Sequence, residues 1–150
     1  MKIIKDKQII EDTWTHIADD DKLTNGDITV SLSRWKQQKT ELSAHNGNMG
    51  IRLAPADKVE ELAADLNQIN LIALEFPAFT DGRSFSHARL LRSRYNFNGE
   101  IRAIGSYMPD QVFYLSRVGV NAFQLEKPEE LKLALSTMED FSVKYQASSD

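Results

Sequence analysis

The chain has 150 residues, no cysteine and a formal net charge of −4 at pH 7. This length suits one domain, residues 1–150, with a core large enough to fold without metals or disulfides. The composition excludes thiol catalysis, cysteine-held iron–sulfur clusters and zinc–thiolate sites, and the mildly acidic balance argues against general nucleic-acid binding. No stretch is apolar enough for a signal peptide or a membrane span, so we expect a cytoplasmic protein without a membrane partner.

The N-terminal region, residues 1–17, is predicted to contain a β-hairpin. Its two short runs of β-type residues, 2–5 and 8–11, flank Asp6 and Lys7, which would form the turn. An acidic, turn-rich connector follows and leads into a different pattern.

Residues 27–146 alternate between short apolar runs and amphipathic segments, which predicts five strand–helix units. We expect strands at residues 28–32, 49–53, 69–74, 100–104 and 120–125. The first two helices should be capped by Ser33 and Asp57, the third should span residues 84–95, and the last two should open at Pro109 and Pro128. Residues 147–150 are expected to form a frayed tail.

Strand–helix alternation of this kind predicts an α/β fold with a mostly parallel sheet flanked by helices. Five units after a hairpin suit a flavodoxin-like three-layer sandwich, and a half-barrel of consecutive units is the alternative. Local sequence does not encode the strand order, so both architectures stay open. In either one, ligands bind at the carboxyl ends of the strands.

The longest loop at such a strand end, residues 75–84, carries the most chemistry. Arg83 and Ser84 stand where the next helix begins, and a helix N-terminus and a guanidinium both attract anionic oxygens. With Arg102 and Ser106, which lie in and after the following strand, they predict a site for an oxoanion or a nucleotide phosphate. A tight turn, a helix cap and an ion pair would explain the same residue types structurally, and that interpretation stays open.

Titratable groups near this loop are candidates for acid–base chemistry. Glu75 ends the third strand, Asp81 lies within the loop, and His87 lies one turn into the following helix. None of them belongs to a recognisable catalytic pattern, so the catalytic residues stay unassigned.

A docking surface for a protein partner is also predicted here. Arg89 and Arg92 are three residues apart and share one helical face, and Phe76 and Phe79 in the preceding loop would supply apolar anchors. A solvated basic helix is the simpler interpretation of the two arginines.

Familiar site motifs are absent from the sequence. It contains no glycine-rich nucleotide fingerprint, no nucleophile elbow and no histidine spacing typical of a metal site. No metal and no cofactor are therefore expected.

The segment Glu-Phe-Pro-Ala-Phe-Thr-Asp-Gly-Arg-Ser-Phe-Ser-His-Ala-Arg-Leu-Leu-Arg at residues 75–92 resembles a bacterial family of unknown function. Members of that family are commonly labelled as oxidoreductases involved in sulfite reduction. The likeness extends through residues 9–14, 30–35, 50–55, 99–105, 110–114 and 117–123. The resemblance implies a link to assimilatory sulfate reduction, whose genes include those for sulfite reductase and adenylylsulfate reductase.

Because the chain has no cysteine, haem motif or dinucleotide fingerprint of its own, the resemblance implies an accessory protein of the pathway and not its redox enzyme. The expected partner is sulfite reductase or another sulfate-assimilation enzyme. The alternative is a small protein or enzyme that binds an oxoanion or a sulfonucleotide at the carboxyl ends of the strands. A third option is a homodimeric structural domain.

Overall fold

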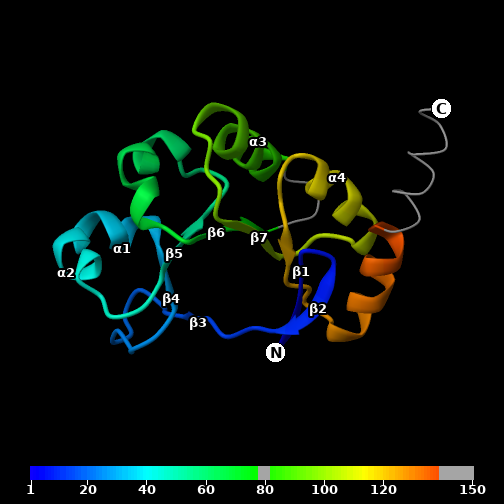
Figure 1. Cartoon of the computed structure of the whole chain (residues 1–150), viewed down its shortest axis with the longest axis horizontal. Helices are drawn as coiled ribbons and strands as arrows, with labels where there is room; N and C mark the ends of the chain where they lie inside the picture. Colours follow the sequence, from blue (N-terminus) through cyan, green and yellow to red (C-terminus); the bar gives the residue numbers. More distant parts are fainter. Residues whose placement is uncertain (78–81, 139–150) are drawn as a thin grey trace.

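The computed structural model describes residues 1–77 and 82–138, which form one curved sheet with helices on its outer side (Figure 1). The sheet has eight strands: β1 (Lys2–Lys5), β2 (Gln8–Glu11), β3 (Thr15–His16), β4 (Ile28–Ser31), β5 (Met49–Leu53), β6 (Leu71–Phe76), β7 (Glu100–Gly105) and β8 (Ala122–Phe123). The α/β class and the N-terminal hairpin are confirmed. In the hairpin, Asp6 and Lys7 form the turn with φ angles of 51° and 66°, as a tight hairpin turn requires.

The strand order decides between the two architectures. The order across the sheet is β2-β1-β8-β7-β6-β5-β4-β3, so strands β3 to β8 are parallel neighbours in chain order. A flavodoxin-like sheet needs one reversal of direction, where a crossover returns to the other side of the first strand. No such reversal occurs among the described strands. The fold is therefore the half-barrel, and β1 extends it by pairing antiparallel with β8.

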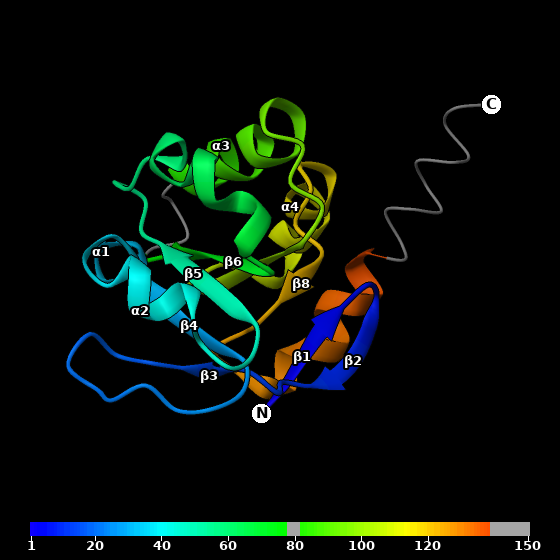
Figure 2. The ribbon, with the colours of Figure 1, turned by 60° about the vertical axis from the view of Figure 1, so that its left-hand side comes forward.

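The helical segments are shorter and less regular than the sequence pattern predicts. They are α1 (Leu32–Gln37), α2 (Lys39–Ser43), the 3₁₀ helix η1 (Val59–Gln68), α3 (Arg83–Arg89), the π-helical turn η2 (Leu90–Arg94), η3 (Pro109–Gln111), α4 (Val112–Arg117) and η4 (Pro128–Glu130), which continues as helical residues 131–138. Figure 2 shows this last helix beside β1 and β2.

Two predicted helix caps are wrong. The first helix is capped by Ser31, whose hydroxyl accepts the Arg34 amide at 3.1 Å, and not by Ser33. Asp57 lies ahead of η1 and accepts a hydrogen bond from the Ala54 amide at 2.8 Å instead. In both cases the residue type was right for a cap, but β4 ended one residue earlier than its apolar run suggested, and η1 began only at Val59.

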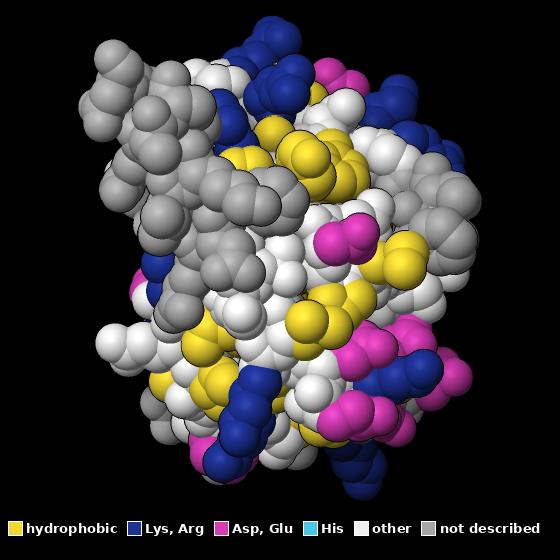
Figure 3. Space-filling view, turned by 90° about the vertical axis from the view of Figure 1, so that its right-hand side faces the viewer, with side chains coloured by type: hydrophobic (Ala, Val, Ile, Leu, Met, Phe, Trp, Pro, Cys, Tyr) yellow, Lys and Arg dark blue, Asp and Glu magenta, His cyan; other side chains and the backbone are white. Residues whose placement is uncertain are grey.

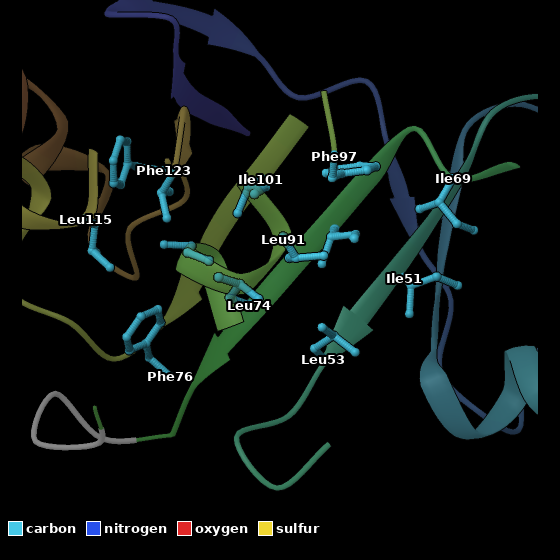
Figure 4. Packing of buried hydrophobic residues seen from close by; sticks show 14 of the residues in the cluster. Ile51, Leu53, Ile69, Leu74, Phe76, Leu91, Phe97, Ile101, Leu115 and Phe123 are labelled. Carbon is cyan, nitrogen blue, oxygen red and sulfur yellow. The ribbon is translucent and has the colours of Figure 1, made fainter. Parts of the chain in front are cut away.

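The two faces of the sheet have opposite character, because the parallel register places residues of like parity on one face. The outer face stacks Val30, Ile51, Ile72 and Ile101 in one layer and Leu53, Leu74, Ala103 and Phe123 in the next. These side chains pack against Leu91 and Leu115 of the helices (Figure 4). The inner face instead carries Thr29, Arg52, Glu75, Glu100 and Arg102 beside small or apolar residues.

The segment between β2 and β3 crosses the inner face (Figure 1), and its Asp12 pairs with Arg102. Arg102 is 1% exposed and contacts Glu100 at 2.8 Å through its Nε and Asp12 at 3.0 Å through a terminal nitrogen. Glu100 also pairs with Lys5 at 3.2 Å. Burial by itself would raise the pKa of Asp12, but hydrogen bonds with His16 and the Trp14 amide, together with Arg102, lower it to about 2. We call Lys5, Asp12, Glu100 and Arg102 the inner-face network.

The amino ends of the strands are joined by a ladder of acidic and amide side chains. Asp27 accepts a hydrogen bond from the Asn48 amide at 3.0 Å, and Asn70 accepts one from the Met49 amide at 3.3 Å. Asn121 repeats this with the Ile101 amide at 2.9 Å. Each of these side chains lies directly before a strand and accepts a hydrogen bond at the start of a neighbouring strand. These hydrogen bonds hold the amino ends of the strands together.

A close contact between Arg92 and Gly119 locks η2 onto the loop before β8. Arg92 donates to the carbonyls of Gly119, Phe97 and Gly99 at 2.9, 2.7 and 2.8 Å. Gly119 has φ +109°, and a Cβ built there would overlap the Arg92 side chain. Glycine is therefore required both for its backbone conformation and for the space it leaves.

Gly119→Ala is expected to lower the free energy of unfolding by about 2–4 kcal/mol, because strain at positive φ adds to a clash with a side chain that is held in place. Gly26→Ala is the matched control: Gly26 has φ +94° but nothing within 4 Å of its added Cβ, so only the strain, about 1–2 kcal/mol, applies. Urea unfolding of both variants measures the difference. Equal losses would show that the contact with Arg92 contributes nothing.

Candidate functional site

A pocket of about 650 Å³ opens at the carboxyl ends of β5 to β8, where the half-barrel architecture places ligands. The pocket lies at the opposite end of the strands from the ladder of acidic and amide side chains. Its lining residues come from each of these strand ends: Ala54, Pro55, Glu75, Phe76, Pro77, Ile104, Gly105, Ser106, Gln124, Leu125 and Glu126, with Met1 added from the N-terminus. The lining is mainly apolar, with a few polar groups, as is typical of small-molecule sites.

The backbone between β6 and β7 shapes one wall of this pocket. The Ser106 amide donates to the Phe76 carbonyl at 2.7 Å and so extends the pairing of the two strands by one residue. Gly105 makes the turn that allows this, with φ +99°, and a Cβ built there would overlap that same carbonyl. Behind the wall, the Tyr107 hydroxyl lies 3.1 Å from the Ala103 carbonyl and 2.9 Å from that of Gln124. The strand tips around the pocket are therefore held in place by contacts within the fold.

Glu75 is the most unusual polar group of the pocket. It is half-buried, and within the described part of the chain its carboxylate receives no hydrogen bond and no ion pair. Burial raises its pKa, Arg52 partly offsets this, and Asp57 and Asp19 raise it further. Arg52 does not pair with it directly, because its guanidinium donates to Thr29 and to the Ile17 carbonyl.

The remaining polar side chains of the pocket lie in the segments that follow β7 and β8. The Ser106 hydroxyl donates to Glu126 at 2.5 Å and so joins the two loops. Gln124 follows β8, and its Oε1 is buried without a hydrogen-bond donor among the described residues. Glu75 and Gln124 thus both present acceptor oxygens that the described structure leaves unsatisfied.

Comparison with known proteins agrees with the sequence resemblance. The family model for the bacterial proteins of unknown function DUF934 matches residues 50–150. The chain belongs to this family. No curated protein matches it. The matched segment begins at β5 and includes every lining residue of the pocket apart from Met1. The matched segment, about two thirds of the chain, thus contains the strand ends that form the pocket.

The structure separates the residues predicted for an anion site. Ser106 lines the pocket, but Arg102 belongs to the buried inner-face network. Ser84 is fully buried, and its hydroxyl donates to the Glu75 carbonyl at 3.0 Å, which joins α3 to the tip of β6. Arg83 is exposed at the start of α3. The four residues therefore do not converge on one point.

The predicted acid–base and docking residues also lie in different parts of the structure and do not form one site. Glu75 lines the pocket, whereas His87 is buried on α3 and is absent from the lining. Phe76 is only 2% exposed and packs against Tyr107 with ring centroids 5.5 Å apart, so it belongs to the core and not to an open surface. Phe79 and Asp81 lie outside the described residues.

Arg89 and Arg92 do not form a shared basic face. Arg89 is exposed, whereas Arg92 turns back to bind three carbonyls and lies 5.9 Å from the centre of the Phe97 ring. Burial lowers the pKa of Arg92 despite the nearby charge of Asp6. Of the two, only Arg89 presents its charge on the surface.

Sequence reasoning located the pocket's loops but missed Gln124 as a polar lining residue. The sequence placed Gln124 inside the strand expected at residues 120–125, but the face that it occupies follows from the register of β8 with β7, which the sequence does not report. None of the described helices is both long and apolar enough to cross a bilayer.

The different roles of the two arginines can be measured. Arg92→Ala is expected to destabilise the fold by about 2–4 kcal/mol, because three partly buried carbonyls lose a charged donor. Arg89→Ala should change the free energy of unfolding by less than about 0.5 kcal/mol, as is usual for exposed positions. Similar losses in both variants, measured by urea unfolding, would contradict the structural role of Arg92.

The pH dependence of stability should distinguish the pocket carboxylate from the inner-face network. Folding raises the pKa of Glu75, so ionisation of Glu75 at neutral pH opposes folding. Glu75→Gln should therefore unfold at a higher temperature than the wild type at pH 7. This gain should disappear below the ordinary glutamate pKa of 4.5.

Asp12→Asn serves as the opposite case. Folding lowers the pKa of Asp12 from 3.8 to about 2. The ionised carboxylate therefore stabilises the fold by about 2 kcal/mol above pH 4, and this stabilisation is lost as the pH falls toward 2. The variant should thus be less stable at pH 7 and approach the wild type in acid. Thermal unfolding across this pH range checks both variants, and a loss of stability in Glu75→Gln at pH 7 would contradict the account of Glu75.

Proposed function

We propose that this chain is an accessory protein of assimilatory sulfate and sulfite reduction, which binds a small molecule in the pocket at the carboxyl ends of β5 to β8 and docks on a pathway enzyme without itself carrying electrons. The observation that carries the proposal is the pocket itself, which has the position, size and apolar lining of a ligand site and lies within the family-matched segment. The pathway comes from the family resemblance described above.

The composition supports an accessory role. The chain has no cysteine, so it has no thiol or cysteine-held cluster with which to accept electrons from a reductase. The pocket's polar groups instead suit binding: no described residue pairs with the Glu75 carboxylate, and Ser106 and Glu126 are linked at the rim. A role in sensing or holding a pathway metabolite, coupled to contact with an enzyme, fits these features.

The surface supports docking at more than one place. Arg89 and Leu90 are exposed side by side on the helical segment after the pocket loop. Tyr114 of α4 and Leu133 of the last helix are 55% and 60% exposed, which is high for residues of this type. Figure 3 shows hydrophobic side chains in separate patches on the side of the molecule that carries the last helix, with acidic side chains grouped below them. Such patches can anchor a partner.

The alternative function is binding of an oxoanion or a sulfonucleotide at the same strand ends. The position of the pocket favours it, but the chemistry does so less: its described lining includes Glu75 and Glu126 and no Lys or Arg. Calorimetry with sulfate, sulfite and adenylylsulfate tests this alternative directly. Heat of binding that is lost in Arg83→Ala would favour it over the accessory role.

The docking proposal is tested by a tagged pull-down from sulfate-grown native cells with mass spectrometry. Sulfite reductase or its electron-donating partner should co-elute at near-stoichiometric yield. Arg89→Glu should reduce that yield several-fold, because it reverses an exposed charge without touching the core, and Lys58→Glu is the matched control at another exposed position. Recovery of the tagged chain alone would contradict docking.

A further inference from the structure

The polar side chains of the pocket share one property, which is that they offer acceptors. Glu75 and Glu126 are carboxylates and can only accept when ionised. The Ser106 proton is already directed at Glu126. The amide of Gln124 carries a donor and an acceptor, and its acceptor oxygen is the atom left without a partner. A ligand that satisfies this set must bring donors.

Glu75 is the strongest of these acceptors. Burial removes part of its hydration, and no described residue donates a hydrogen bond to its carboxylate in return. A buried or half-buried carboxylate ordinarily gains a cation or several N–H donors. The nearest guanidinium, that of Arg52, is held by Thr29 and Ile17 on the inner face. Moving it to Glu75 would take this donor from the Ile17 carbonyl, so the described residues do not supply the missing partner.

The rest of the pocket sets the shape of the ligand. Pro55, Phe76, Ile104 and Leu125 provide apolar walls on several sides. A volume of about 650 Å³ accommodates a small organic molecule and is much larger than a bare ion requires. Carboxylates among mainly apolar walls indicate a ligand with a polar head and an apolar body.

We propose that the pocket binds a small molecule that carries an amine or ammonium group on an apolar or aromatic body, with the nitrogen placed between Glu75 and Gln124. This inference rests on the proposed function of the pocket as a ligand site and adds the chemical class of its occupant. It is opposite in charge to the oxoanion that the arginine-rich sequence predicts, because Arg92 binds carbonyls, Arg102 binds carboxylates, and no arginine belongs to the described lining of the pocket.

Two probes with the same body and opposite charge test the inference. Phenethylamine and 3-phenylpropionate both carry a phenyl ring on a two-carbon chain, and they end in an ammonium and a carboxylate. Each is titrated at millimolar concentrations into the isotope-labelled full chain, and the NMR signals of Ile104, Ser106 and Gln124 are followed. The variants are Glu75→Gln and, as a control of the same chemical change at an exposed position outside the pocket, Glu60→Gln.

The expected result is a saturable shift of the pocket signals with phenethylamine at an affinity at least about tenfold higher than that of 3-phenylpropionate, since one probe pairs with a carboxylate and the other is repelled by it. Glu75→Gln should weaken amine binding about tenfold and leave 3-phenylpropionate unchanged or tighter. Glu60→Gln should change neither. Thermal unfolding of Glu75→Gln, expected to show a folded and somewhat more stable protein, confirms that the loss is local.

Other outcomes overturn the inference in distinguishable ways. Tighter binding of 3-phenylpropionate at the same signals would reject the amine class and leave the pocket as a ligand site. Absence of any shift with both probes would reject the amine class together with the pocket's role as a ligand site. Amine binding that survives Glu75→Gln would show that the apolar walls alone hold the probe, which also contradicts the assignment.

Discussion

The half-barrel depends on how the charged inner face of its sheet is neutralised. A closed barrel fills its interior with side chains from all its strands, but here the described strands curve through only part of that circle. Arg102 and Glu100 would be left facing solvent or each other, and the segment carrying Asp12 closes over them instead. Buried ion pairs of this kind add little net stability, yet removing one partner is costly. The network therefore fixes where the N-terminal segment crosses the inner face of the sheet, and so which part of that face the segment leaves uncovered.

The two ends of the strands show different degrees of hydrogen-bond satisfaction. At the amino ends, Asp27, Asn70 and Asn121 each accept a backbone amide of a neighbouring strand. At the carboxyl ends, Glu75 and the Gln124 oxygen have no such partner among the described residues. A fold normally pairs its buried polar groups, so acceptors that no described residue pairs make this pocket a candidate for the ligand proposed above. The contrast within one sheet is what makes the carboxyl-end pocket the candidate site.

Sequence patterns predicted the class, the hairpin and the position of the site better than they predicted the site's members. Apolar runs identified strands such as Met49–Leu53 because a strand covered on one face by helices needs them. Strand order depends on the direction in which each crossover turns, and no local pattern reports that choice. Ser31 replaced Ser33 as a cap because the strand ended early. Arg102 could not be assigned from sequence, since its partner Asp12 belongs to a distant part of the chain.

The arginines of residues 83–102 explain why the sequence suggested an anion site while the structure presents an acidic pocket. A guanidinium has donors in several directions, and in a loop-rich fold it can satisfy carbonyls that no strand or helix reaches. Arg92 does this for three carbonyls and Arg102 neutralises two carboxylates, so neither charge acts on the pocket. Arg52, the cation whose charge most affects Glu75, is itself held by Thr29 and Ile17. Among the side chains that line the described pocket, the charged ones are then Glu75 and Glu126. A cluster of arginines in a sequence can therefore serve as hydrogen-bond donors within the fold, and it does not by itself indicate an anionic ligand.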